Sequence, residues 1–424
     1  MAQKIKVAEL FAGVGGFRYA FEKSDKDFFE TVYANQYEPS TKRQYSFEVY
    51  EANYGKSNDK QFHDNTDIQK VNDILKENKD YIKGSIDLVV GGFPCQDYSV
   101  ATTGSKGLVG KKGVLFWEIE KFLIHTQPKY LFLENVDRLL MSPKAQRGRD
   151  FLIMLHILNK HNYIVEWSVI NAGDYGFAQK RKRVMIFAYK EDTNIGRNVS
   201  IERVKEDFNQ VINFTTLTKN LNIQPIEEFQ SKDISGISLK DLSDSGTFNF
   251  KNYGFIKDNI IWTTKVKPVY TGTKTILEDI LVTEGINDYI LSEDQKDRIF
   301  KLKDGSRQKR ITKDGFEYFY VAGAMSRFDN RGDRPGRTML TSEGSINRSS
   351  HIIKIDEDTY RFITPIEAER LNGFPDDWTS STNSIRKRYF VMGNALVTGV
   401  IQSIGKAIRF YETQEKERGM IDGI

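Results

Sequence analysis

The sequence of 424 residues has a single cysteine, Cys95, and little net charge. One thiol excludes an intramolecular disulfide, and a reducing compartment fits this composition. The first residues, MAQKIKVAELFAGVGG, lack the long apolar core of a secretory signal. No apolar run approaches the length that spans a bilayer. We therefore expect a soluble, cytoplasmic protein.

Charge of either sign is not in large excess. The chain holds 62 Lys and Arg against 58 Asp and Glu, a formal net charge of +4. This balance neither demands nor excludes a nucleic-acid partner, so the distribution of charge has to decide. Internal repeats and low-complexity segments are also lacking, and the length favours two domains.

The pattern of apolar and polar residues changes at about Lys190. Up to about Lys190, short apolar runs alternate with amphipathic stretches. The runs that we predict as buried strands span residues 5–11, 31–34, 86–92, 130–134, 163–170 and 183–189. Strands that alternate with helices imply an α/β fold with a doubly wound, mostly parallel sheet.

The following stretch, to about Phe374, is rich in Asn, Thr, Ser and Gly and poor in helical periodicity. Its basic residues cluster at 301–310 and 327–337. We predict a first domain over residues 1–192, completed by a C-terminal helix within 386–424. Residues 193–385 then form a second, smaller and less regular domain.

The segment FAGVGG, Phe11 to Gly16, directly follows the first predicted strand. Glycines let the backbone approach a ligand and turn into a helix whose N-terminus offers free N–H groups. This pattern indicates a nucleotide-type cofactor site at the carboxyl end of the strand. Arg18 occupies the third glycine position of G-x-G-x-x-G, which disfavours a nicotinamide or flavin cofactor. A tight turn without a ligand is the alternative.

The segment GGFPCQDYS carries Cys95 just past another predicted strand. A lone cysteine is usually a small buried hydrophobe. Here two glycines and a proline place it on a turn, and the Gly- and Lys-rich stretch 101–113 predicts a mobile loop after it. A thiol on such a loop is accessible, and nearby cations favour the nucleophilic thiolate.

Two polar motifs complete the set. Glu134, in ENV, follows the strand YLFL at the sheet edge where we also expect Cys95. It is a candidate general acid if its surroundings raise its pKa, or it stabilises the next helix N-terminus. In QKRKR, alternation places Gln179, Arg181 and Arg183 on one face. That face is suited to a base or phosphate, unless it is only a solvated strand entry.

Taken together, and in their order along the chain, these motifs resemble those of the DNA cytosine-5 methyltransferase family of the bacterial restriction-modification type. FAGVGG, GGFPCQDYS, ENV and QKRKR match the family one for one, and RPGRTMLTSEG and Gly393-Asn394-Ala395 resemble its last two motifs. The resemblance covers about 1–190 and 334–410. It implies the Rossmann-like fold of S-adenosyl-L-methionine-dependent methyltransferases, with residues 193–385 as the target-recognition domain for double-stranded DNA.

The resemblance also assigns roles to residues. It implies four catalytic residues: Cys95, Glu134, Arg181 and Arg183. It implies a cofactor site with Phe11 against the adenine, made of Phe11, Gly13, Val14, Gly15, Gly16, Gln36, Asp67, Ile68, Pro94 and Asn394. Asn394 would also help to join the two domains. Contacts to DNA are expected from Gln96, Ser99, Lys309 and Arg310, with Ser99 on the loop that closes over the duplex. No metal is expected.

One position departs from the family. The family places an acid at the end of the second strand to bind the cofactor ribose, and the matching residue here is Gln36, with Glu38 two residues on. An amide binds a hydroxyl less strongly than a carboxylate does. The ribose ligand is therefore either of these two residues.

The implied chemistry agrees with the residue types. A Cys95 thiolate that adds to cytosine carbon 6 creates an enamine-like ring able to attack a sulfonium methyl group. A proton from Glu134 near the ring nitrogen stabilises that ring, and the base has to be flipped out of the duplex.

The implied protein is a monomeric bacterial modification enzyme, accompanied by a restriction endonuclease that acts on the same site. The alternatives are a tRNA cytosine-5 methyltransferase, a catalytically silent DNA-binding protein on this fold, and a nicotinamide-dependent dehydrogenase.

Overall fold

The computed structural model describes residues 4–93, 114–206, 221–311, 315–330 and 332–421. The chain divides into two compact units. The first unit comprises Met1–Tyr175, Lys182–Gly272 and Thr398–Ile424, and the second comprises Gly176–Arg181 and Thr273–Val397. The predicted limits at 193 and 386 differ from these, because residues 193–272 pack with the first unit and the last helix of that unit begins at Thr398.

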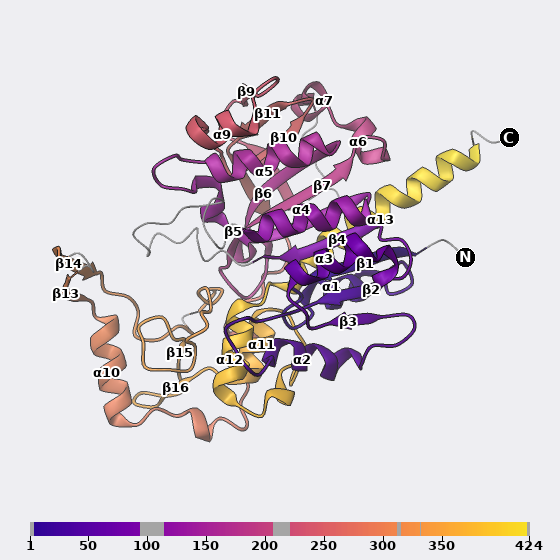
Figure 1. Cartoon of the computed structure of the whole chain (residues 1–424). Coiled ribbons are helices and arrows are strands. Elements are labelled where there is room, and N and C mark those ends of the chain that lie inside the picture. The colour runs from indigo at the N-terminus through magenta and orange to yellow at the C-terminus, as the bar shows by residue number, and fades with distance from the viewer. Residues whose placement is uncertain (1–3, 94–113, 207–220, 312–314, 331, 422–424) are drawn as a thin grey trace. The chain divides into compact units, whose positions relative to one another are not determined.

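A large mixed sheet forms the centre of the first unit (Figure 1). Among the described residues it has ten strands in the order β3-β2-β1-β4-β5-β7-β6-β10-β11-β9. Their bounds are β1 Ile5–Leu10, β2 Phe29–Asn35, β3 Phe62–Asp64, β4 Leu88–Gly92, β5 Tyr130–Val136, β6 Tyr163–Asn171, β7 Lys182–Lys190, β9 Gln230–Asp233, β10 Tyr253–Lys257 and β11 Ile260–Thr264.

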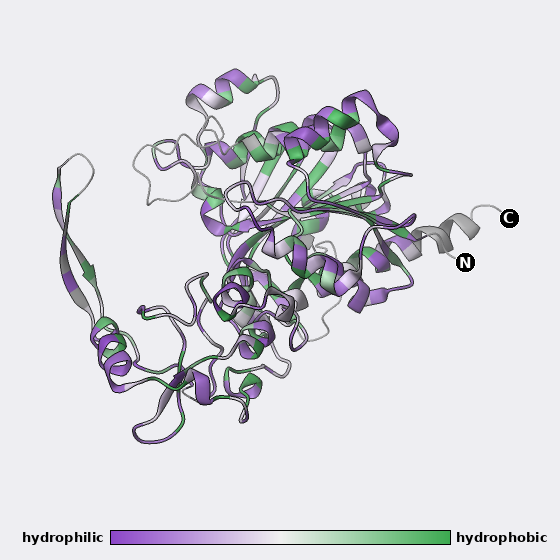
Figure 2. Ribbon diagram, turned by 60° about the horizontal axis from the view of Figure 1, so that its bottom comes forward, coloured by the Kyte–Doolittle hydropathy of each residue, from purple (hydrophilic) through white to green (hydrophobic). Residues whose placement is uncertain are grey.

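The half of the sheet with β3, β2, β1, β4 and β5 is parallel. Its central strands are buried along nearly their whole length, and Figure 2 shows the hydrophobic residues gathered along them. Parallel strands buried in this way need helices on both faces, which explains why apolar runs alternate with amphipathic segments in the sequence. The predicted α/β class with a largely parallel sheet is confirmed.

Strand β7 runs antiparallel to both of its neighbours, β5 and β6. Three more antiparallel strands, β10, β11 and β9, extend the sheet beyond β6. Their pairing explains why residues 221–272 belong to the first unit. A separate two-stranded sheet pairs β8 Leu221–Pro225 with β12 Val266–Tyr270.

Helices of the first unit pack in pairs, with α1 against α13, α3 against α4 and α5 against α9. The helices are α1 Gly16–Asp25, α2 Tyr45–Tyr54, α3 Ile68–Glu77, α4 Val114–Thr126, α5 Arg149–Lys160, α6 Asn194–Asn198, α7 Ile201–Glu206, α9 Leu239–Ser245 and α13 Thr398–Ile421. The C-terminal helix therefore completes the first unit, as the apolar face of that segment predicts.

The second unit has little regular structure around a small apolar cluster of Leu291, Ile299, Ile352 and Phe362. Its helices are α10 Glu293–Lys303, α11 Pro365–Leu371 and α12 Ile385–Asn394. Its strands form two hairpins, β13 Ser306–Ile311 with β14 Glu317–Ala322, and β15 Ile352–Lys354 with β16 Tyr360–Phe362. In the described part of the chain, no single helix is long and apolar enough to cross a membrane, and only α12 and α13 taken together pass that test.

Candidate active site

The predicted glycine turn lies at the end of β1, directly before α1. Phe11, Gly13 and Gly15 all have positive φ, at +53°, +57° and +83°. A side chain at Gly15 would also lie 2.5 Å from the ring of Tyr54. Both the positive φ of Gly15 and the nearby Tyr54 ring therefore favour glycine at this position. The turn leads into the N-terminus of α1, whose N-cap residue is Gly15 and therefore has no side chain to cap the helix.

The sequence analysis did not single out Glu9, which lies beneath this turn. Its side chain is fully buried, and its carboxylate accepts a hydrogen bond from the Phe17 N–H at 3.1 Å. Burial raises the pKa of Glu9 to about 8, although the nearby Arg18 cation opposes the shift. An acid among the apolar residues Val7, Ala8 and Leu10 of the predicted buried strand was the available signal. Glu9 therefore anchors the first turn of α1 from inside the sheet.

Arg18, at the position of the missing third glycine, packs against α2 and β3. Its guanidinium lies 4.0 Å from the centre of the Tyr54 ring and pairs with Glu22 at 2.7 Å. It also donates to the Gln61 side chain at 2.8 Å. The departure from G-x-G-x-x-G thus has a packing reason, because an arginine here links three elements around the turn.

Gln36 follows β2 and reaches the glycine turn. Its side-chain oxygen accepts a hydrogen bond from the Gly13 N–H at 2.8 Å. Glu38, the alternative ribose ligand, instead accepts from the Ser46 hydroxyl at 2.7 Å. Its backbone N–H donates to Gln44. Of the two, Gln36 therefore lies beside the turn, while Glu38 fastens the loop to the start of α2.

Asp67 and Ile68, the predicted adenine-contacting pair, lie at the start of α3. The Asp67 carboxylate caps the helix by accepting from the Gln69 N–H at 3.0 Å, and Ile68 is buried. Strand register aligns the ends of β1, β2 and β3, since Leu10 pairs with Asn35 and Asn35 with Asp64. The turn, Gln36 and Asp67 thus follow neighbouring strands at one edge of the sheet.

Glu134 lies inside β5, opposite Gly92 of β4. Its carboxylate forms an ion pair with the Arg183 guanidinium at 2.7 Å, and both side chains are largely buried. Gly92 leaves room for this carboxylate, because a Cβ there would lie 3.3 Å from Glu134 Oε2. The neighbouring Asn135 donates to the Phe93 carbonyl at 3.1 Å and so fixes the backbone that leads to Cys95.

The three alternating residues of QKRKR do not act as one set, which corrects the prediction of a common face. Arg183, on β7, contacts Glu134 in the first unit. Gln179 and Arg181 are buried in the second unit. Arg181 donates to the carbonyls of Met339 at 3.3 Å and Gly393 at 3.1 Å. The reason is that these residues precede β7 and bond to backbone there, so the alternation that holds within a strand does not extend to them.

Gln179 pairs with the segment around Gly336 as a short parallel bridge. Its side chain donates to Asn372 at 2.9 Å and accepts from the Met339 N–H at 3.0 Å. Gly393, at the end of α12, packs against the same segment, since a Cβ there would lie 2.4 Å from the Thr341 nitrogen. Asn394 itself is exposed, and its cofactor contact stays a prediction.

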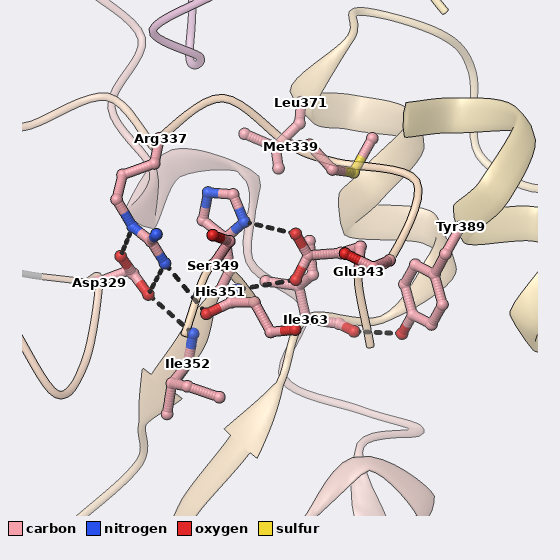
Figure 3. Close-up of polar contacts among 12 residues, drawn as sticks. Asp329, Arg337, Met339, Glu343, Ser349, His351, Ile352, Ile363, Leu371 and Tyr389 are labelled. Atoms are coloured by element: carbon pink, nitrogen blue, oxygen red, sulfur yellow. Dashed lines mark hydrogen bonds and ion pairs between the residues drawn. The ribbon is translucent and has the colours of Figure 1, made fainter. Parts of the chain in front are cut away.

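A buried polar network holds this part of the second unit in place (Figure 3). Arg337 pairs with Asp329 at 2.5 Å, and His351 bonds to Glu343 at 2.9 Å with both side chains fully buried. Burial alone would raise the pKa of Asp329, but the hydrogen bond from Arg337 and the nearby His351 and Lys303 hold it at about 2. These contacts tie the segment around Arg337 and Met339, which is the partner of Gln179, to Asp329 and to the start of β15.

The remaining predicted site residues lie outside the described residues or on strand β13. Pro94, Cys95, Gln96 and Ser99 lie outside the described residues. Lys309, on β13, pairs with Glu317 at 2.6 Å, and both side chains are about half exposed. Arg310 lies on the same strand, opposite Tyr318.

A glycine turn after the first parallel strand, with Glu134 and Arg183 paired across strands β5 and β7 of the same sheet, is typical of α/β enzymes that bind a nucleotide-type cofactor. The fold agrees with that of solved methyltransferases. EhMeth of Entamoeba histolytica has a TM-score of 0.56 at 14% identity and covers 98% of this chain and 99% of its own. Dnmt2 of S. pombe has a TM-score of 0.57 at 14% identity, with 97% and 99% covered.

The sequence comparisons identify the family. The model of the C-5 cytosine-specific DNA methylases matches residues 5–409. The Type II methyltransferase M.Sau3AI of Staphylococcus aureus is 46% identical over 96% of this chain and 95% of its own. M.HpaII of Haemophilus parainfluenzae is 24% identical over 96% and 90%. The chain therefore belongs to the C-5 cytosine-specific DNA methylase family.

Proposed function

We propose that the protein transfers a methyl group from S-adenosylmethionine to carbon 5 of a flipped-out cytosine in a short, specific site of double-stranded DNA. Cys95 is the nucleophile. The observation that carries this proposal is the ion pair of Glu134 and Arg183 beside Gly92, three residues before the only thiol of the chain.

The residues at the sheet edge fit S-adenosylmethionine. At Gly13 the space where a Cβ would lie is open: among the described residues beyond its two chain neighbours, the nearest atom is the Phe11 carbonyl oxygen, at 4.0 Å. Gln36 offers an amide beside the turn. Phe11, Val14, Gly15, Gly16, Asp67, Ile68, Pro94 and Asn394 complete the proposed site. When bound, the cofactor supplies an activated methyl group on a sulfonium.

The chain's own residues prepare the cytosine. The Cys95 thiolate forms a bond to carbon 6, which shifts electron density to carbon 5 so that this atom takes the methyl group. Glu134 holds a proton at the ring nitrogen, and Arg183 contacts the base oxygen and orients Glu134. Loss of the carbon-5 proton then expels the thiolate. Arg181 acts as a positioning residue through its bonds to two backbone carbonyls.

We assign reading of the DNA site to the predicted recognition region, 193–385. Its part 273–385 belongs to the second compact unit, whereas Glu134 and Arg183 lie on the sheet of the first. The identity to a Type II methyltransferase supports a role in protecting host DNA in the bacterial cytoplasm, beside a restriction endonuclease of the same site. We expect a monomer, because one catalytic set and one recognition region suffice for one cytosine.

Incubation with tritiated S-adenosylmethionine and DNA, RNA or neither tests the proposal. We expect label in duplex DNA alone, and bisulfite sequencing of DNA from a methylation-free host that expresses the protein should show one short protected sequence. Label in transfer RNA alone, or none with intact protein, would contradict it.

A further inference from the structure

The hairpin of β13 and β14 has an unusual surface. Cross-strand partners share a face, and one face pairs Arg307 with Val321, Lys309 with Phe319, and Ile311 with Glu317. All six residues are exposed. The exposed fractions of the three apolar side chains are 64% for Ile311, 54% for Phe319 and 68% for Val321. Figure 2 shows the hairpin continuing beyond α10 as a narrow ribbon.

The base of this ribbon is fastened to the second unit. Ala322 is buried, and the Met325 N–H donates to the Lys303 carbonyl at 2.8 Å. Lys303 is itself buried and pairs at 3.3 Å with Asp329, a residue that Figure 3 shows bonded to Arg337. The two strands form a sheet of their own. An isolated two-stranded hairpin is marginal in water, so this rigid base and exposed apolar face indicate a surface that meets a partner.

The charge of the ribbon favours a polyanion. Residues 306–322 contain four Lys or Arg against two Asp or Glu. The Arg307 guanidinium lies 4.3 Å from the centre of the Phe319 ring, which holds cation and ring together on one face. A second copy of the chain would bring the same cations against each other. A duplex instead offers phosphates to the cations and apolar thymine methyl groups in its major groove, which is wide enough for a two-stranded ribbon.

We infer that the β13–β14 hairpin enters the major groove of the DNA site, with Arg307 and Lys309 on phosphates and Ile311, Phe319 and Val321 against thymine methyl groups. This inference rests on the proposed function and names the element that reads the sequence. Phe319 is the specificity-determining residue at the centre of the face. Arg307 orders its ring and contacts the backbone of the duplex.

The test compares Phe319→Ala and Arg307→Ala with Arg298→Ala, a matched change on the exposed face of α10. Because these side chains are exposed, the variants should keep the melting temperature of the parent. Fluorescence anisotropy measures binding to a duplex with the methylated site and to a scrambled duplex. We expect Phe319→Ala to weaken site binding by about 5- to 150-fold, the range of one base contact, and to leave scrambled binding nearly unchanged. Arg307→Ala should weaken both, and Arg298→Ala neither.

Uracil in place of each thymine of the site removes the methyl groups alone. We expect the parent protein to bind the uracil duplex more weakly than the thymine duplex. Phe319→Ala should bind the two duplexes equally well. Equal loss in both proteins, or site binding unchanged in Phe319→Ala, would overturn the inference. So would a change of oligomeric state in Phe319→Ala with normal DNA binding, since the face would then cover a second copy. Failure of the parent protein to methylate any DNA would instead refute the proposed function.

Discussion

Arg183 and Glu134 lie on adjacent antiparallel strands and meet through Nε and Oε1 at 2.7 Å. Strand β5 places the carboxylate beside Gly92, and β7 brings the guanidinium to it from the other side. Because both are largely buried, this ion pair has a fixed geometry before any base enters. The site is therefore preorganised around the carboxylate that we propose for the cytosine ring nitrogen.

Glu134→Gln should lower kcat by about 10²- to 10⁴-fold, since an amide cannot hold the proton that the ring nitrogen needs. Glu120→Gln is the matched control, because Glu120 pairs with His161 away from the sheet edge. Steady-state methyl transfer to a duplex measures both. Equal activity of the two variants would show that Glu134 does not act on the base.

Gly15→Ala should destabilise the fold by more than the backbone conformation alone requires. Gly15 has φ +83° and ψ 35°, a left-handed conformation that costs about 1–2 kcal/mol for other residues, and the added Cβ would also lie 2.5 Å from the Tyr54 ring. In a Tyr54→Ala background the same substitution should therefore cost less. Urea unfolding measures both differences, and Gly15→Ala should also bind S-adenosylmethionine more weakly by calorimetry. Equal losses of stability in the two backgrounds would contradict the close contact with Tyr54.

Glu9 should make stability depend on pH. Its folded pKa, about 8, lies above its ordinary value, so its contribution is fully present below about pH 4.5 and is lost as pH rises through 8. Glu9→Gln keeps an acceptor for the Phe17 N–H without a charge. The variant should match the parent near pH 5 and exceed it at pH 8.5, by on the order of a few kcal/mol. A difference in urea midpoints that is the same at both pH values would refute this.

DNA binding should weaken steeply with salt, because Lys and Arg release counterions when they contact phosphates. Lys309→Ala combined with Arg310→Ala should weaken binding to all sequences alike and lower the log–log slope by about 2. Lys240→Ala, on the exposed face of α9, is the control. An unchanged slope in the double variant would remove these residues from the DNA interface.

Much of the fold follows from the sequence because its central strands are long apolar runs. The runs predicted for β1, β2 and β4 to β7 all form strands of the sheet. Strands β9, β10 and β11 were missed, since each has only four or five residues and lies in a polar stretch. The partner of β10 is β6, some 85 residues earlier, and local periodicity carries no information on such pairing.

The motifs located the site residues but not their partners. Glu134 and Arg183 stood out separately, whereas their ion pair depends on β7 lying antiparallel beside β5. Arg181 looked like its neighbour Arg183, yet it binds carbonyls more than 150 residues away in sequence. Glu9 was overlooked because its role depends on a hydrogen bond to the N-terminus of α1, which the sequence of the strand does not reveal.

The covalent role of Cys95 is the central claim, and a duplex with 5-fluorocytosine at the methylated position tests it most directly. Fluorine cannot leave carbon 5 as a proton does, so the bond between Cys95 and carbon 6 should persist. We predict a denaturant-resistant protein–DNA complex that forms only with S-adenosylmethionine and maps to the Cys95 peptide. Cys95→Ser should bind the duplex and stay folded but form none, because an alcohol is almost fully protonated at neutral pH. A complex that maps elsewhere, or normal methyl transfer by Cys95→Ser, would contradict the account.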